Sequence, residues 1–131
     1  IDNFKQINDR YGHESGDLAI KHLGQILKKS TRPCDLVARM GGDEFIVYVK
    51  NPTDITLSKV TKLIFLNLEK NPLVLKDKIL PFTLSLGTVN QRNNGTLSTG
   101  ELLNYADLAM YDSKLLGRNR VSTYQPAVET I

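Results

Sequence analysis

Hydrophobic residues recur at helical spacing in several stretches of the chain. Phe4, Ile7 and Tyr11 predict a short helix over residues 3–11. A longer helix is expected over residues 15–31, before Pro33. Its apolar positions share one face: Leu18, Leu23, Ile26 and Leu27. A third helix is expected over residues 54–70, with an apolar stripe of its own: Leu57, Val60, Ile64 and Leu68.

A fourth helix is marked by its ends. Ser98 and Glu101 have the spacing of a capping box, in which each side chain satisfies the other residue's main-chain N–H. The helix is expected to run to about Leu116, where Gly117 suits the C-terminal cap. Before it, the polar residues 90–96 with Asn93-Asn94-Gly95 predict a loop.

Alternating apolar residues predict the strands. Residues 36–40 and 45–50 flank Gly41-Gly42, which is the signal of a hairpin. Further strands are expected over residues 82–89 and 120–124. Helices and strands are therefore interleaved around a hairpin, and this order predicts an α+β fold with an antiparallel-rich sheet covered by helices.

Composition places the chain among globular proteins. Its 131 residues are 40% apolar and 24% charged, which suits one domain and excludes disorder and coiled-coil arrays. The longest apolar run, Phe45–Val49, is too short to cross a bilayer. A single cysteine, Cys34, excludes an internal disulfide and suits the cytoplasm. The net charge of +3 is too slight to argue for nucleic acid, although it allows a local cluster of cations that meets phosphate.

The expected hairpin turn holds two adjacent carboxylates, Asp43 and Glu44, after two glycines. Glycine lets a ligand approach the main chain closely. Carboxylate oxygens are ligands for magnesium, which keeps further positions for water and phosphate. An ordinary solvated turn is the plainer interpretation of this tetrapeptide taken alone.

Four other groups of residues admit two interpretations each. Asn8 and Asp17 flank the break between the first two helices and suit either a purine edge or helix caps. His13 suits either a loop or a ligand contact, and a histidine in this setting is more often a loop residue. Lys114 and Arg118 are expected on one helix face, either to grip phosphate or to offset the helix dipole, and Lys5 is equally ambiguous. Arg32 and Asp35 suit a local ion pair or a guanine contact.

Together these segments resemble the GGDEF family of diguanylate cyclases. The resemblance runs from Ile1 to about Tyr124 in six blocks that keep the family's order. The blocks are Asp2-Asn3-Phe4-Lys5 with Asn8-Asp9, Tyr11-Gly12-His13 with Gly16-Asp17, Arg39-Met40-Gly41-Gly42-Asp43-Glu44-Phe45, Thr83-Leu84-Ser85-Leu86-Gly87, Ala106-Asp107 with Tyr111 and Lys114, and Gly117-Arg118-Asn119.

The resemblance implies a fold and an activity. The fold would be a palm-like, mostly antiparallel central sheet with flanking helices, similar to nucleotide cyclases and polymerases. Each domain would bind one GTP with Mg²⁺ or Mn²⁺. Two facing domains would join two GTP molecules into cyclic di-GMP and release two pyrophosphates, so that a homodimer is needed.

The resemblance also implies roles for individual residues. Asp43 would be catalytic and bind the metal together with the carbonyl of Ile1. Glu44, also catalytic, would help to hold the metal or deprotonate the attacking hydroxyl. Asn8 and Asp17 would contact guanine. The implied phosphate contacts come from three cations and nearby main chain: Lys5, Lys114, Arg118, Asn3 and Phe4. His13 and Gly42 complete the nucleotide pocket. Arg32 and Asp35 match the R-x-x-D product site that inhibits the enzyme.

The chain departs from the family's sequence pattern in one way that bears on the expected activity. The family carries a metal-binding Asp immediately before the position of Ile1, and most of the family's first strand precedes it as well. We therefore expect this chain to be an N-terminally truncated domain of a larger sensor protein, with little or no cyclase activity by itself. The alternatives are a catalytically inactive domain that binds cyclic di-GMP or GTP, and the noncatalytic half of a protein with a phosphodiesterase domain.

Overall fold

The computed structural model describes residues 1–91 and 95–125, so Asn93 and Asn94 of the predicted loop lie outside the described residues. The helices are α1 (Phe4–Tyr11), α2 (His13–Ser30), α3 (Asp54–Lys70) and α4 (Thr99–Leu115). The strands are β1 (Leu36–Gly41), β2 (Glu44–Tyr48), β3 (Leu73–Leu75), β4 (Lys78–Leu80), β5 (Ser85–Thr88) and β6 (Arg120–Thr123). The chain forms two compact units; the first comprises Ile1, Asn3–Asn51 and Ile55–Phe82.

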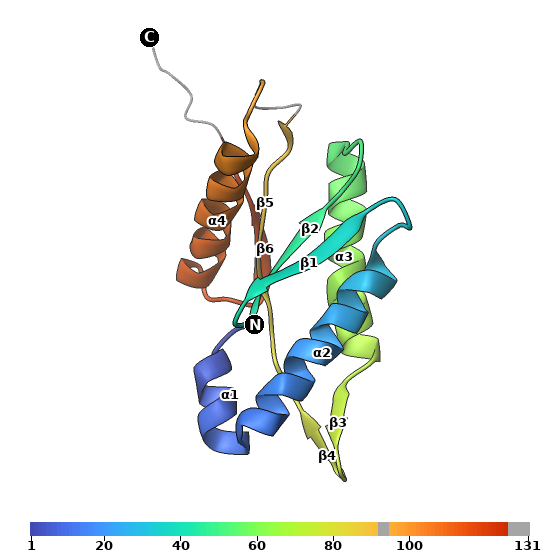
Figure 1. The fold of residues 1–131 in the computed structure, drawn as a ribbon, viewed down its shortest axis with the longest axis vertical. Helices are drawn as coiled ribbons and strands as arrows, with labels where there is room; N and C mark the ends of the chain where they lie inside the picture. The colour runs from blue at the N-terminus through green and yellow to red at the C-terminus, as the bar shows by residue number, and fades with distance from the viewer. Residues whose placement is uncertain (92–94, 126–131) are drawn as a thin grey trace. The chain divides into compact units, whose positions relative to one another are not determined.

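Helices α1 and α2 of the first unit meet at a sharp corner (Figure 1). Gly12 forms the corner with φ 92°, a conformation that favours glycine. The second helix begins at His13 rather than at residue 15. The prediction for Leu18 was wrong, because that side chain is 46% exposed while Ala19 and Ile20 beside it are buried. Leu23, Ile26 and Leu27 are buried as predicted.

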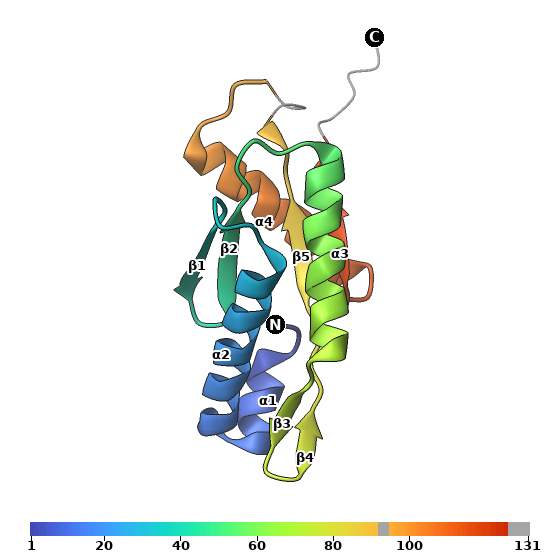
Figure 2. The same ribbon diagram turned by 90° about the vertical axis from the view of Figure 1, so that its right-hand side faces the viewer.

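Strands β1 and β2 form the predicted antiparallel hairpin. Leu36 pairs with Tyr48 and Arg39 with Phe45, and an irregularity lies between Arg39 and Gly41. Figure 2 shows the hairpin turning back beside the C-terminal half of α2. A methyl group added at Gly24 of α2 would meet the Phe45 ring at 3.7 Å, so the inner face of the hairpin packs on that helix.

A second hairpin, β3–β4, completes the first unit. It pairs Leu73 with Leu80 and Leu75 with Lys78. Leu80 is 2% exposed and belongs to a core cluster with Ile7 and Ala19, so the hairpin covers the apolar side of the α1–α2 corner. Helix α3 buries the predicted positions Val60 and Ile64. It is tied to α2 because the Asn67 amide donates to Ser30 Oγ over 2.9 Å.

The second unit comprises Asp2, Pro52–Asp54 and the described residues from Thr83 onward. Its strands β5 and β6 pair in parallel, Ser85 with Arg120 through Thr88 with Thr123. Helix α4 connects them and packs so closely on β5 that a β-carbon at Gly87 would stand 2.1 Å from the Ala106 carbonyl oxygen. The predicted capping box is confirmed, since Glu101 N donates to Ser98 Oγ and Ser98 N to Glu101 Oε1.

The α+β class is confirmed. Among the described residues the strands form three two-stranded sheets, two antiparallel and one parallel, with flanking helices. No helix in the described part of the chain is long and apolar enough to span a membrane.

Candidate functional site

The tip of the β1–β2 hairpin carries the two predicted carboxylates. Gly42 turns the chain with φ 52°, and the Arg39 guanidinium closes the turn by donating from Nε to the Gly42 carbonyl over 2.9 Å. The side chain of Asp43 is 32% exposed, and Glu44 is exposed. The turn therefore presents both carboxylates where a ligand can reach them.

The start of the chain lies against this turn. The amino group of Ile1 is 3.3 Å from Asp43 Oδ2, and the Ile1 side chain is fully buried. This contact joins the amino nitrogen of Ile1 to Asp43, and the role of the Ile1 carbonyl as a metal ligand stays a prediction. Carboxylate and carbonyl oxygens are hard donors that suit magnesium or manganese. The described residues contain no group of three or more His, Cys, Asp or Glu side chains that could hold a metal ion. A metal at this turn would therefore need main-chain or substrate oxygens as further ligands.

The predicted guanine contacts lie at the α1–α2 corner. Asn8 is half-buried in α1, while Asp17 and His13 are exposed in the first turns of α2. Asn8 and Asp17 are not helix caps, because the caps are Asn3 and Gly12. The Asn8 amide rests on Gly16 of α2, where a β-carbon would stand 1.8 Å from Asn8 Oδ1. This contact places the amide beside the main chain that carries Asp17.

The N-terminus of α1 holds three further predicted residues. Asn3 precedes the helix in a left-handed conformation, with φ 55°, and accepts the first helical hydrogen bond from Ile7 N. The N–H groups of Phe4 and Lys5 precede that bond and have no partner within the helix. The helix dipole favours an anion at this end, where the Lys5 side chain is exposed.

The remaining two cations belong to the second unit. Lys114 is exposed on the last turn of α4, but the prediction that Arg118 shares its helix face was wrong. The helix ends at Leu115, and Gly117 reverses the chain with φ 120°. Arg118 follows in a left-handed conformation, and its N–H donates to the Ser113 carbonyl over 2.9 Å. This hydrogen bond is the mark of a Schellman cap.

Asp2 is a structural residue that sequence reasoning missed. Its carboxylate accepts hydrogen bonds from Thr83 Oγ1 over 2.6 Å, from Ser85 Oγ and from the main-chain N–H of Asn119 over 3.0 Å. Burial raises the pKa of Asp2, but these three hydrogen bonds outweigh it and leave the pKa below its ordinary value. Asp2 thereby fixes the turn that follows Arg118. Its partners lie more than 80 positions away, so no local pattern marked them.

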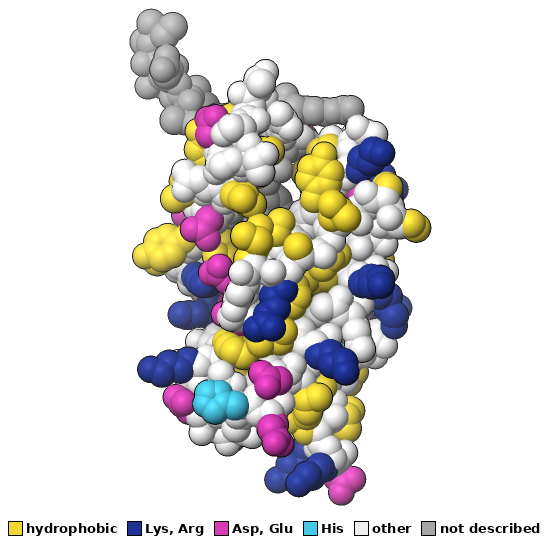
Figure 3. Space-filling model, in the orientation of Figure 1, with side chains coloured by type: hydrophobic (Ala, Val, Ile, Leu, Met, Phe, Trp, Pro, Cys, Tyr) yellow, Lys and Arg dark blue, Asp and Glu magenta, His cyan; other side chains and the backbone are white. Residues whose placement is uncertain are grey.

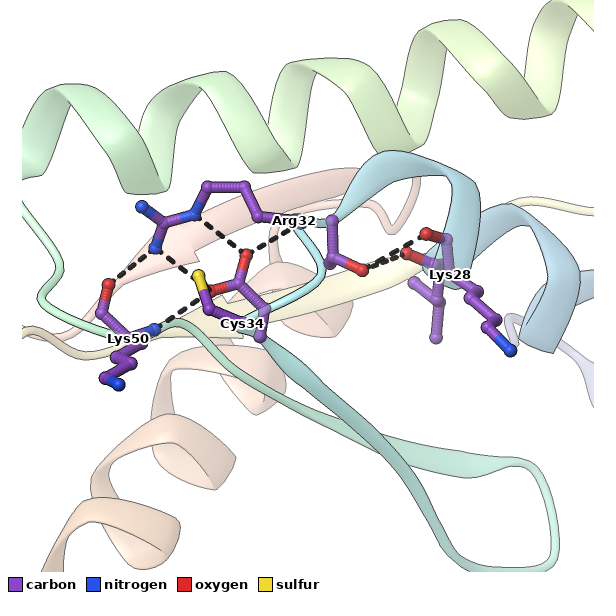
Figure 4. A network of polar contacts seen from close by, with 7 residues as sticks. Lys28, Arg32, Cys34 and Lys50 are labelled. Atoms are coloured by element: carbon purple, nitrogen blue, oxygen red, sulfur yellow. Dashed lines mark hydrogen bonds and ion pairs between the residues drawn. The ribbon is translucent and has the colours of Figure 1, made fainter.

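The predicted product site, Arg32 and Asp35, forms the local ion pair. The buried Asp35 carboxylate accepts from Arg32 Nη2 over 2.9 Å, from Arg32 Nε over 3.1 Å and from Lys50 N over 3.0 Å. The guanidinium also donates to the Lys50 carbonyl, as Figure 4 shows. The hydrogen bond from the Arg32 side chain is the main reason that the pKa of Asp35 falls to about 2. Arg32 itself stays 44% exposed.

Side chains of both charges lie on the face that Figure 3 draws, Lys and Arg as well as Asp and Glu. This pattern agrees with the small net charge of +3. With so small a net charge, local groups such as the α1 N-terminus are the places that suit phosphate.

A known protein family matches most of this chain. The family model described as "Diguanylate cyclase, GGDEF domain" matches residues 1–120. Diguanylate cyclase A of Treponema denticola is 38% identical over 122 residues, which cover 93% of this chain and 33% of that protein. The chain thus spans about a third of the length of this curated relative.

Two solved structures extend the comparison. An EAL/GGDEF domain protein from M. capsulatus is 31% identical, has a TM-score of 0.86, and the match covers 96% of this chain and 81% of that one. A microbial GGDEF domain studied for its interaction with cyclic di-GMP is 26% identical, with a TM-score of 0.64 and coverage of 93% and 72%. The chain belongs to the GGDEF family of diguanylate cyclase domains.

Proposed function

We propose that the protein is a diguanylate cyclase, which condenses two GTP molecules into cyclic di-GMP and two pyrophosphates. The observation that carries the proposal is the β1–β2 turn, where the accessible carboxylates of Asp43 and Glu44 follow two glycines and the amino nitrogen of Ile1 lies 3.3 Å from Asp43 Oδ2. A cyclase needs carboxylates that can hold a metal ion beside the phosphates, because negative charge develops there as the bond to pyrophosphate breaks.

The proposed reaction assigns a role to each carboxylate. Asp43, with the Ile1 carbonyl, would hold Mg²⁺, and Mn²⁺ suits the same donors. A bound divalent cation supplies charge stabilisation at the triphosphate. Glu44 would assist at the metal or accept the proton of the 3′-hydroxyl, whose oxygen attacks the α-phosphorus of the other GTP. The bond from that phosphorus to pyrophosphate breaks in the same displacement.

One set of residues would contact the guanine base of the nucleotide, and another set would contact its phosphates. Asn8 and Asp17 offer a complementary set of donors and acceptors for guanine, with His13 beside them and Gly42 in the hairpin turn. Lys5 and the main chain of Asn3 and Phe4 lie at the N-terminus of α1, where an anion is favoured. We assign further phosphate contacts to Lys114 and Arg118, and substitution of each tests that assignment.

Turnover would require a homodimer, because one domain holds a single GTP while the reaction joins two. Regulation would act through Arg32 and Asp35. The ion pair holds the guanidinium in a fixed orientation while leaving it 44% exposed, and a planar guanidinium suits bidentate contacts with guanine or phosphate of cyclic di-GMP. An Arg32→Ala variant is expected to relieve product inhibition while turnover persists.

The second candidate is a receptor that binds cyclic di-GMP without making it. The Arg32–Asp35 pair favours it, because this pair is complete without any residue of the hairpin turn. The intact sequence from Gly41 to Phe45 favours the enzyme.

One experiment distinguishes the two candidates. The full-length protein is incubated with GTP and Mg²⁺, and nucleotides are separated by chromatography. A Glu44→Gln variant removes the proposed catalytic group, and Glu14→Gln, an exposed carboxylate of α2, is the matched control. The proposal expects cyclic di-GMP from wild type and Glu14→Gln and none from Glu44→Gln. Absence of product from wild type, with cyclic di-GMP still bound in a titration, would support the receptor.

A further inference from the structure

Helix α2 contains two glycines in very different surroundings. A β-carbon at Gly24 would meet only the Phe45 ring, at the ordinary contact distance of 3.7 Å. A β-carbon at Gly16 would stand 1.8 Å from Asn8 Oδ1, 2.9 Å from Asn8 Cγ and 3.3 Å from Phe4 Cζ. Glycine weakens a helix, so its presence at residue 16 calls for a packing reason. The reason is the amide of Asn8, which occupies the space of the missing side chain.

The Asn8 amide is held by this packing alone. Within residues 1–91 and 95–125 its side chain has no hydrogen-bond partner, although its main-chain carbonyl accepts from Gly12 N over 2.8 Å. Its donors and acceptor are therefore free for a ligand. The surface against which it rests is the main chain immediately before Asp17, the second residue assigned to guanine.

We propose that Gly16 is a positioning residue for base specificity: the absence of its side chain lets the Asn8 amide lie beside Asp17, so that the two recognise guanine together. This inference rests on the proposed function, because it presumes that Asn8 and Asp17 contact the base. A methyl group at residue 16 meets the end of a flexible side chain, which moves away by rotation. The helix corner therefore keeps its fold while the amide leaves its place.

The test compares Gly16→Ala with Gly24→Ala in the full-length protein. Binding of non-hydrolysable GTP and ATP analogues is measured by calorimetry, and the ratio of the two dissociation constants reports base preference independently of turnover. Gly16→Ala is expected to reduce the preference for GTP by about tenfold, the size of one lost base-edge contact. Gly24→Ala is expected to keep the wild-type ratio. Thermal melts of both variants are expected to stay near that of wild type.

A double-mutant cycle separates positioning from general damage. In an Asn8→Ala protein the amide is gone, so adding Gly16→Ala is expected to change the ratio no further. Equal base preference in Gly16→Ala and wild type would overturn the inference, and so would an additional loss in the double variant. Failure of Gly16→Ala to fold would also overturn the inference, because the inference requires the Asn8 amide to move aside while the helix corner keeps its fold. A wild-type protein that does not prefer GTP would instead contradict the assignment of Asn8 in the proposed function, and this inference with it.

Discussion

The Asp35 carboxylate illustrates how single residues hold this molecule together. It is fully buried and accepts hydrogen bonds from the Arg32 guanidinium and from the main-chain N–H groups of Arg32 and Lys50. It therefore joins the turn after α2 to the end of the β1–β2 hairpin, before any ligand is considered. A product site built on this pair would use a guanidinium whose orientation is already fixed.

The ion pair predicts a pH dependence of stability. The ordinary pKa of 3.8 falls to about 2 in the folded protein, mainly through the hydrogen bond from Arg32 and against the effect of burial. Because the folded-state pKa is the lower one, this stabilisation is complete above the unfolded-state pKa and is lost as pH falls toward about 2. Urea unfolding of Asp35→Asn is expected to show a loss of about 2 kcal/mol at pH 7.

That loss is expected to shrink as the pH falls, because the wild-type carboxylate is then also neutral. Asp9→Asn, an exposed carboxylate on α1, is the matched control and is expected to differ little from wild type at any pH. A difference between Asp35→Asn and wild type that stays constant from pH 7 to pH 2 would contradict this account of the pair.

A larger loss of stability is expected when the Asp2 carboxylate is removed. Replacing it by Ala leaves Thr83, Ser85 and the main-chain N–H of Asn119 without their acceptor. Chemical denaturation of Asp2→Ala is expected to show a loss of about 3 kcal/mol in the free energy of unfolding, with Asp9→Ala near wild type. Equal stability of the two variants would show that the buried carboxylate does not hold these segments.

At the scale of elements, the contact of α4 with β5 depends on a close approach of main chains. A β-carbon at Gly87 would stand 2.2 Å from Met110 N, and backbone atoms do not move aside as a side chain does. Gly87→Ala is therefore expected to lose about 1–3 kcal/mol of stability in thermal or urea unfolding.

Gly100 is the control for that variant, because it lies in the first turn of the same helix and a β-carbon there would meet only Ser98 Oγ, at 3.9 Å. Gly100→Ala is expected to be neutral or slightly stabilising, since alanine favours helix. Similar stability of the two variants would contradict the close packing of α4 on β5.

Elements with a strong pattern were predictable from the sequence, and those with weak local signals were not. The apolar stripe of α3 and the capping box of α4 correctly placed those helices. The β3–β4 hairpin was missed because its strands are only three residues long and its turn uses Lys76 at φ 53°, where glycine or asparagine is the usual signal. The parallel pairing of β5 with β6 depends on contacts across α4, which spacing alone does not reveal.

The candidate site was predictable mainly as a set of residues. Local motifs marked Asp43, Glu44 and the Arg32–Asp35 pair. Of the two alternatives for that pair, the local ion pair is the one that the structure contains. The contact of Asn8 with Gly16 was not predictable, because it depends on how two helices cross at the Gly12 corner. The end of α4 at Leu115, which separates Arg118 from the face of Lys114, depends in the same way on a cap geometry.

At the scale of the whole molecule, the proposed reaction predicts a dependence on protein concentration. Each domain would bring one GTP, so dilution that separates the two copies removes the reaction partner. Specific activity of the full-length protein is expected to rise with protein concentration and then level off, in parallel with the dimer fraction measured by sedimentation. Constant specific activity in samples that sediment as monomers would contradict the two-domain mechanism.

The central claim is the chemistry itself, and product stoichiometry tests it most directly. The full-length protein is given GTP with Mg²⁺, and cyclic di-GMP and pyrophosphate are quantified together by mass spectrometry and an enzymatic pyrophosphate assay. The account predicts two pyrophosphates for each cyclic di-GMP, and neither product after chelation of the metal. Release of inorganic phosphate and GDP in place of these products, or unchanged GTP, would contradict the account.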